Sequence, residues 1–135
     1  MGFQEILPFI FIVVFGVMLG QWFSSKTMKK KMYHRIKIVP VDVFKKNMRK
    51  GQLIDLRKSD RFEKDRIKGA RNFSMRYLKN KRQTLVRKDQ DLYLYCQNGK
   101  KSARVARKLL SRFPKELYVL DGGFNAYKAS KTNTK

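Results

Sequence analysis

The single cysteine of the chain, Cys96, stands where an apolar run meets a polar loop. Residues 92–95, LYLY, predict a buried strand, and a helix is expected to begin near Ser102. The loop between them consists of Gln97, Asn98, Gly99, Lys100 and Lys101. Loop N–H groups, a helix N-terminus and nearby lysines all stabilise a thiolate. The pattern therefore predicts a nucleophilic thiol beside a loop that can hold an anion.

A lone cysteine is more often a small buried hydrophobic residue than a reactive one. A core cysteine, however, needs no polar, glycine-containing loop directly behind it. One cysteine excludes an intramolecular disulfide, and Cys96 together with the single histidine, His34, cannot form a metal site. We therefore expect no metal and no cofactor.

Apolar runs and helix signals alternate through the rest of the chain and indicate how this loop is positioned. They predict an α/β domain with a central, mostly parallel sheet flanked by helices, preceded by one N-terminal transmembrane helix. Ligands of such sheets bind beyond the carboxyl ends of the strands, where Cys96, Asp55 and Arg57 are expected to lie. Strands are expected at 36–39, 53–56, 92–95 and 117–120, and helices at 42–50, 59–64, 102–113 and 124–129.

The N-terminal segment reads as a membrane anchor. Residues 6–23 carry no charge and are just long enough to span a bilayer as a helix. A cleaved signal peptide is the rival interpretation, but the residues before Ile6 lack a basic region. The expected organisation is an anchor at 1–25, a basic linker at 26–35, a domain at 36–129 and a polar tail at 130–135.

Lysines and arginines outnumber acidic residues by 33 to 10, for a net charge of +23. Several of the lysines directly follow the anchor, so the positive-inside rule predicts a single-pass protein of the cell membrane with a cytoplasmic domain. Such a charge attracts acidic lipid headgroups, nucleic acid or small anionic substrates. Because no nucleic-acid-binding motif is present, we expect an anionic membrane surface or a small anion as the partner.

The segment from Cys96 to Ser102, CQNGKKS, resembles the active-site loop of the rhodanese family, which is roughly Cys-x-x-Gly-x-Arg-Ser. Three further segments are similar to family motifs and occur in family order: LIDLR at 53–57, IKGARN at 67–72 and LDGG at 120–123. The resemblance covers about residues 36–129. Arg61, Arg66, Lys101 and Tyr127 depart from the residues that are frequent in the family at their positions.

The resemblance implies a rhodanese-type sulfurtransferase in which Cys96 carries a persulfide. The donor would be a small anion such as thiosulfate, and the acceptor would be cyanide or a thiol of a small molecule or protein. Residues 97–102 would form the substrate-binding loop, with Lys100 and Lys101 attracting the donor. Asp55 and Arg57 would support that loop, although an ordinary ion pair at a strand end explains them equally well.

Two other functions remain open. Cysteine phosphatases and arsenate reductases share this fold, but the phosphatase loop, Cys-x5-Arg, is one residue longer, and the sixth position after Cys96 is Ser102. The domain could instead be a membrane-tethered rhodanese-like binding or regulatory module without turnover.

Overall fold

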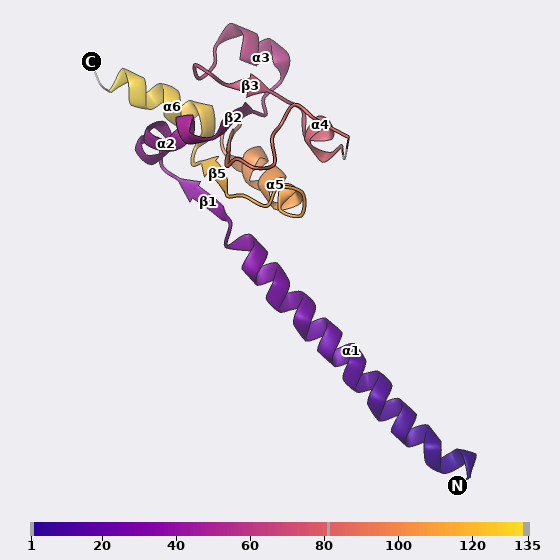
Figure 1. Ribbon diagram of the computed structural model, residues 1–135. Helices are drawn as coiled ribbons and strands as arrows, with labels where there is room; N and C mark the ends of the chain where they lie inside the picture. Colours follow the sequence, from indigo (N-terminus) through magenta and orange to yellow (C-terminus); the bar gives the residue numbers. More distant parts are fainter. Residues whose placement is uncertain (1, 81, 134–135) are drawn as a thin grey trace. The chain divides into compact units, whose positions relative to one another are not determined.

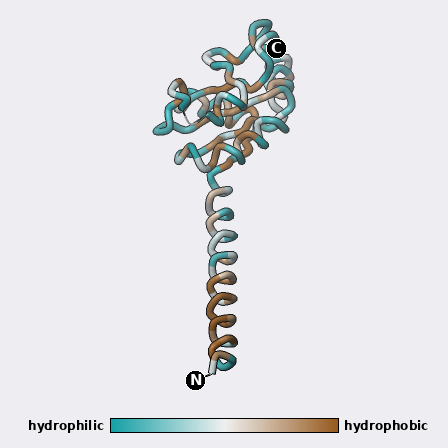
Figure 2. Tube along the Cα trace, turned by 90° about the vertical axis from the view of Figure 1, so that its right-hand side faces the viewer, coloured by the Kyte–Doolittle hydropathy of each residue, from teal (hydrophilic) through white to brown (hydrophobic). Residues whose placement is uncertain are grey.

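The computed structural model describes residues 2–80 and 82–133. The chain forms two compact units, which divide between Met32 and Tyr33. Most of the first unit belongs to helix α1 (Phe3–Tyr33), whose apolar side chains are exposed. In Figure 2, several successive turns of this helix are brown, the colour of hydrophobic residues. By length and composition, Phe3–Lys30 is able to cross a membrane, and none of it is buried within the protein.

The basic segment after the apolar stretch differs from the expected linker, because α1 remains helical as far as Tyr33. No glycine or proline occurs between Ser24 and Tyr33, and lysine and methionine are good helix formers. The basic charges therefore lie on a continuation of the apolar helix.

The second unit is an α/β domain, as the sequence predicts. Within the described residues, one fully parallel sheet has the strand order β1-β5-β4-β2-β3. The strands are β1 (Ile36–Val39), β2 (Gln52–Asp55), β3 (Arg71–Asn72), β4 (Leu92–Tyr95) and β5 (Leu117–Leu120). The helices are α2 (Val41–Asn47), followed by the 3-10 turn η1 (Met48–Lys50), then α3 (Ser59–Lys64), α4 (Met75–Lys79), α5 (Lys100–Leu109) and α6 (Gly123–Thr132).

Helices cover both faces of the sheet. Tyr93 and Tyr95 of β4 share a core cluster with Phe44 of α2 and Phe124 of α6. Because neighbouring strand residues point to opposite faces, the buried Leu94 faces the other side, where α5 packs on the sheet. Figure 1 shows α2 beside α6, with α5 and α4 across the strands. This arrangement places the loop after β4 at the carboxyl edge of the sheet.

Some observed bounds differ from the expected ones. Helix α5 begins at Lys100 rather than near Ser102 and ends at Leu109. Helix α6 continues to Thr132, so the first part of the expected polar tail is helical. The last two tail residues, 134–135, lie outside the described part of the chain, as does residue 81 in the basic segment that was expected to be a loop.

Candidate active site

Cys96 directly follows β4, and its side chain is only 2% exposed. Its Sγ accepts hydrogen bonds from the backbone N–H groups of Gly99 at 3.2 Å and Ser102 at 3.3 Å. The Ser102 hydroxyl lies 3.4 Å from Sγ and donates a hydrogen bond to the Gly99 carbonyl. Both N–H groups belong to the N-terminal end of α5, where the helix dipole also favours negative charge. These contacts suit a thiolate, or a larger anionic sulfur species, at this position.

The Cys96 loop, residues 96–102, folds tightly against the turn after β5. Gly99 has φ of 90°, and a Cβ there would lie 3.1 Å from the Gly122 nitrogen. Gly123 has φ of 60°, and a Cβ there would lie 2.5 Å from the Cys96 carbonyl oxygen. Glycine is therefore required on both sides of this contact, since any side chain would push the loop away from the turn.

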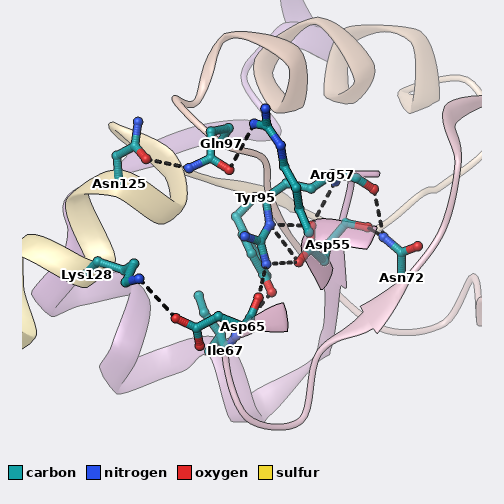
Figure 3. Close-up of polar contacts among 10 residues, drawn as sticks. Asp55, Arg57, Asp65, Ile67, Asn72, Tyr95, Gln97, Asn125 and Lys128 are labelled. Atoms are coloured by element: carbon teal, nitrogen blue, oxygen red, sulfur yellow. Dashed lines mark hydrogen bonds and ion pairs between the residues drawn. The ribbon is translucent and has the colours of Figure 1, made fainter. Parts of the chain in front are cut away.

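Hydrogen bonds from the start of α6 hold the same loop in place. The Phe124 N–H donates to the Cys96 carbonyl at 2.8 Å, and the Asn125 N–H donates to the Gln97 carbonyl at 3.1 Å. The Gln97 side-chain amide also donates to the side-chain oxygen Oδ1 of Asn125, as Figure 3 shows. The first turn of α6, which begins at the last glycine of the LDGG segment, thus holds the backbone of Cys96 and Gln97 in place.

A cavity of about 220 Å³ opens beside Cys96. Among the described residues that line it, the side chains are cationic, amide or apolar apart from the thiol, and none is acidic. They are Leu56, Arg57, Lys58, Arg61, Cys96, Gln97, Asn98 and Lys101. A cavity lined in this way attracts small anions and concentrates them next to the sulfur.

The lysines and arginines of the cavity are held to different extents. Lys101 Nζ donates to the Leu56 carbonyl at 2.9 Å, which ties α5 to the segment after β2. Arg61 reaches across from α3 to the Gln97 side-chain oxygen at 3.5 Å, a long hydrogen bond. The Lys58 side chain makes no hydrogen bond or ion pair within residues 2–80 and 82–133. Lys58 and Arg61 therefore have the weakest contacts with other protein groups among the four cationic side chains of the cavity.

Asp55 and Arg57 form a buried ion pair at the end of β2. Arg57 Nη2 lies 2.8 Å from Asp55 Oδ2, and the Arg57 guanidinium carbon lies 3.8 Å from the centre of the Phe124 ring. Burial alone would lower the pKa of Arg57, but the hydrogen bonds and negative charge of Asp55 raise it above its ordinary value. The pair therefore keeps Arg57 charged and oriented at the wall of the cavity.

The IKGARN segment completes this polar network (Figure 3). The Ile67 N–H donates to the Tyr95 hydroxyl, and the Asn72 side-chain amide donates to the carbonyls of Asp55 and Arg57. Burial, followed by the hydrogen bond and charge of Asp55, raises the pKa of Tyr95 well above its usual range. The Ile67 backbone and the Asn72 side chain of this segment thus bind the ends of β4 and β2, from which Cys96 and Arg57 emerge.

The sequence-predicted site residues gather in this one region, but with different contacts. The cavity is lined by five of them, Arg57, Cys96, Gln97, Asn98 and Lys101. Gly99 and Ser102 are not part of the lining, but their backbone N–H groups donate hydrogen bonds to Cys96 Sγ. Lys100 is exposed and is not among the residues that line the cavity, so the expectation that it attracts the donor remains a prediction.

Sequence reasoning did not select Lys58 and Arg61 as site residues, yet both line the cavity. They follow Arg57 at the carboxyl end of β2, the edge of the sheet where ligands bind, and that position is the signal that could have identified them. The described residues contain no group of three or more His, Cys, Asp or Glu side chains that could hold a metal ion.

Comparison with known proteins matches residues 40–130 to the family model described as Rhodanese-like domain. The chain is 34% identical over 118 residues to the uncharacterized protein YqhL of Bacillus subtilis (strain 168), covering 87% of this chain and 90% of that protein. It is also 34% identical over 77 residues to the thiosulfate sulfurtransferase GlpE of Coxiella burnetii (strain RSA 493 / Nine Mile phase I), covering 57% of this chain and 71% of that protein.

Among solved structures, reduced CoADR-RHD of Bacillus anthracis superposes with a TM-score of 0.61 at 28% sequence identity. The match covers 70% of this chain but 17% of that longer protein. The likeness therefore extends over the α/β domain and not over the larger protein.

Proposed function

The chain belongs to the rhodanese-like domain family, and from that premise we propose that it is a sulfurtransferase whose Cys96 carries a sulfane sulfur as a persulfide. The observation that carries this proposal is the position of Cys96 Sγ. It accepts two backbone hydrogen bonds at a helix N-terminus and borders a cavity lined by four cationic side chains. The similarity to a thiosulfate sulfurtransferase supports the same reaction.

In the first half-reaction, the Cys96 thiolate attacks the outer sulfur of an anionic donor such as thiosulfate. A sulfur–sulfur bond forms to Cys96, the sulfur–sulfur bond of thiosulfate breaks, and sulfite leaves with the electron pair. The product is the persulfide anion Cys96–S–S⁻. Arg57, Lys58, Arg61 and Lys101 line the cavity and would offset the two negative charges of the donor as it approaches.

In the second half-reaction, an acceptor nucleophile attacks the outer sulfur of the persulfide. A thiolate acceptor takes that sulfur and becomes a persulfide, whereas cyanide becomes thiocyanate, and in both cases the Cys96 thiolate is regenerated. The Gly99 and Ser102 N–H groups stabilise negative charge on sulfur before and after each transfer. The chemistry therefore needs no proton donor in the cavity.

A second candidate function is a tethered rhodanese-like binding module without turnover. The observation that favours it is the burial of Cys96, whose side chain is 2% exposed and so admits only small or extended acceptors. A cysteine phosphatase is not proposed, because the position that such a loop gives to arginine is occupied by Ser102, whose hydroxyl bonds the Gly99 carbonyl.

We also propose that α1 places the protein in the cell membrane as a single span with the domain in the cytoplasm. Support comes from the apolar length of Phe3–Lys30 and from the lysines at its C-terminal end. Protease added outside intact cells should leave the domain uncut, and efficient cleavage from outside would reverse the assigned orientation.

The sulfurtransferase proposal is tested by the intact mass of the full chain in neutral detergent micelles. Thiosulfate should add one sulfur atom, and cyanide should remove it with release of thiocyanate. Cys96→Ser should add none while retaining the wild-type circular dichroism spectrum. A wild-type protein that gains no sulfur from thiosulfate or from a small-molecule persulfide would support the binding module instead.

A further inference from the structure

A second cavity lies at the other end of α5 from the Cys96 loop. It has a volume of about 280 Å³, and its lining combines buried apolar side chains with polar and cationic ones. The lining residues are Leu78, Asn80, Gln83, Lys88, Ser111, Arg112 and Phe113. Helix α5 is ten residues long, which separates its two ends by about 15 Å. The cavity is therefore distinct from the candidate active site.

One guanidinium nitrogen at this cavity has no partner. Arg112 Nη1 is buried and makes no hydrogen bond within the described part of the chain. Burying a charged donor without an acceptor is unfavourable, and proteins normally provide an acceptor for such a group. The other nitrogens of the Arg112 side chain also make no hydrogen bond or ion pair within the described part of the chain, and an oxygen atom of a ligand in the cavity would supply an acceptor for them.

The charge of the cavity is also uncompensated. No acidic residue lines it, and neither Lys88 nor Arg112 belongs to any of the ion pairs of the described residues. Part of the lining is apolar, because it includes Leu78 and Phe113, which are almost completely buried. Two cations beside an apolar lining attract an anion more strongly than the same charges on an open surface.

The negative end of α5 does not oppose an anion here. Arg35 Nη1 donates to the Phe113 carbonyl and Nη2 donates to the Leu110 carbonyl, each at 2.7 Å. These carbonyls, on either side of Arg112, would otherwise present negative partial charge at the C-terminal end of the helix. Arg35 neutralises them and leaves the Arg112 guanidinium available.

We propose that this cavity is a phosphate-binding site built around Arg112. The planar guanidinium binds two phosphate oxygens at once, the Lys88 ammonium adds a second positive charge, and the Ser111 hydroxyl adds a donor. The chemical class of the ligand is a phosphate group, either free or on the headgroup of an anionic phospholipid.

The short segment between the apolar stretch of α1 and the domain favours a phospholipid headgroup as the source of the phosphate group. Arg35 lies twelve positions after Phe23, the end of the apolar stretch. Even a fully extended segment of that length spans only about 40 Å, so headgroups are within reach of the domain whatever the arrangement of the two units. This choice of source rests on the proposed membrane span, but the phosphate site itself depends neither on the span nor on sulfur transfer.

The phosphate site is tested with the full chain in neutral detergent micelles. Inorganic phosphate is titrated at constant ionic strength against chloride, and the rise in thermal midpoint is recorded. The rise should require roughly tenfold more phosphate in Arg112→Gln and Lys88→Gln, and somewhat less than that in Arg112→Lys, which keeps the charge but loses the planar fork. Arg107→Gln, which removes an exposed charge from the same helix outside this cavity, should respond as the wild type does.

Equal phosphate responses of the wild type, Lys88→Gln and Arg112→Lys would overturn the site, even if Arg112→Gln failed to fold. Sulfur loading is measured on every variant and should be unchanged, so a failed phosphate site and a failed sulfurtransferase give different results.

The lipid arm uses the full chain in nanodiscs of phosphatidylcholine, with or without phosphatidic acid. Hydrogen exchange at segments 78–88 and 110–113 should slow with phosphatidic acid in the wild type and in Arg107→Gln, but not in Arg112→Lys. A phosphate response without this lipid effect would assign the site to a free phosphate compound. Failure of both titrations would overturn the proposal.

Discussion

The backbone N–H of Phe124 lies 2.8 Å from the carbonyl oxygen of Cys96 and donates a hydrogen bond to it. This contact joins the start of α6 to the residue that is proposed to carry sulfur. Because Gly123 precedes Phe124, the contact depends on a backbone conformation and a closeness that only glycine allows.

We expect Gly123→Ala to impair the site more than an equivalent change elsewhere. Its Cβ would come within 2.5 Å of the Cys96 carbonyl oxygen at φ of 60°, so the Cys96 loop must move. Gly69→Ala is the matched control, because Gly69 also has positive φ but no atom lies within 4 Å of the added Cβ. Both variants should lose about 1–2 kcal/mol from backbone strain. Only Gly123→Ala should also slow sulfur capture from thiosulfate, and equal rates in the two variants would contradict the role of this contact.

Asp55→Asn is expected to destabilise the domain strongly. It leaves the buried Arg57 guanidinium without its counter-charge, and breaking such a pair typically costs about 3–5 kcal/mol. The control is Asp89→Asn, which breaks the exposed Arg87–Asp89 pair and should change the free energy of unfolding very little, because solvent screens an exposed pair. Chemical denaturation measures both. Similar losses in the two variants would show that the Asp55–Arg57 pair has no special importance for stability.

Arg61→Gln and Lys58→Gln should weaken capture of a doubly charged donor. Each variant removes a positive charge that lines the cavity and has only weak contacts with other protein groups. The value of kcat/KM for thiosulfate should therefore fall by roughly three- to tenfold at low salt. The loss should shrink as salt is added, because exposed charges are screened. Arg107→Gln and Lys108→Gln remove charges outside this cavity and should have little effect. An equal loss in those controls would attribute the effect to overall charge.

Tyr93 gives the domain a defined sensitivity to alkali. Burial, followed by the charges of Tyr118 and Asp91, raises the pKa of Tyr93 to about 12. An unfolded tyrosine loses its proton near pH 10, so the stabilisation is complete below about pH 10 and is lost as pH rises toward about 12. In denaturation series, Tyr93→Phe should therefore lose less stability than the wild type across this range. Parallel pH profiles for wild type and Tyr93→Phe would contradict this prediction.

Much of the fold follows from local sequence signals. Residues 36–39, 92–95 and 117–120 were expected as strands, and the observed strands have those bounds. Each is a short apolar run that ends at a proline, a polar loop or a glycine pair, and such signals are strong over short distances. The start of α5 was placed two residues too late, because the left-handed Gly99 lets the helix begin immediately after it.

The residues that line the cavity are less predictable from the sequence than the strands are. Lys58 and Arg61 line the cavity with Cys96. Their position after the carboxyl end of β2 marks the edge of the sheet where ligands bind, but no local pattern says which of the side chains at that edge reach the cavity. The bond from Lys101 to the Leu56 carbonyl is likewise tertiary, and it explains why Lys101 lines the cavity while its neighbour Lys100 does not. Cys96 itself was identifiable, because its strand, loop and helix are contiguous in the chain.

The pairing of β1 with β5 has a consequence for how the protein is made. Ile36 lies opposite Leu117, and Arg35 binds carbonyls at 110 and 113, so the first strand of the domain finds its partners about 80 residues later in the chain. At typical rates of synthesis, that interval lasts roughly 4–16 s. The apolar helix thus leaves the ribosome before the sheet can close, which leaves time for the membrane insertion that is proposed above. Insertion would precede folding, and the strand next to the helix would wait unpaired until the C-terminal strand emerges.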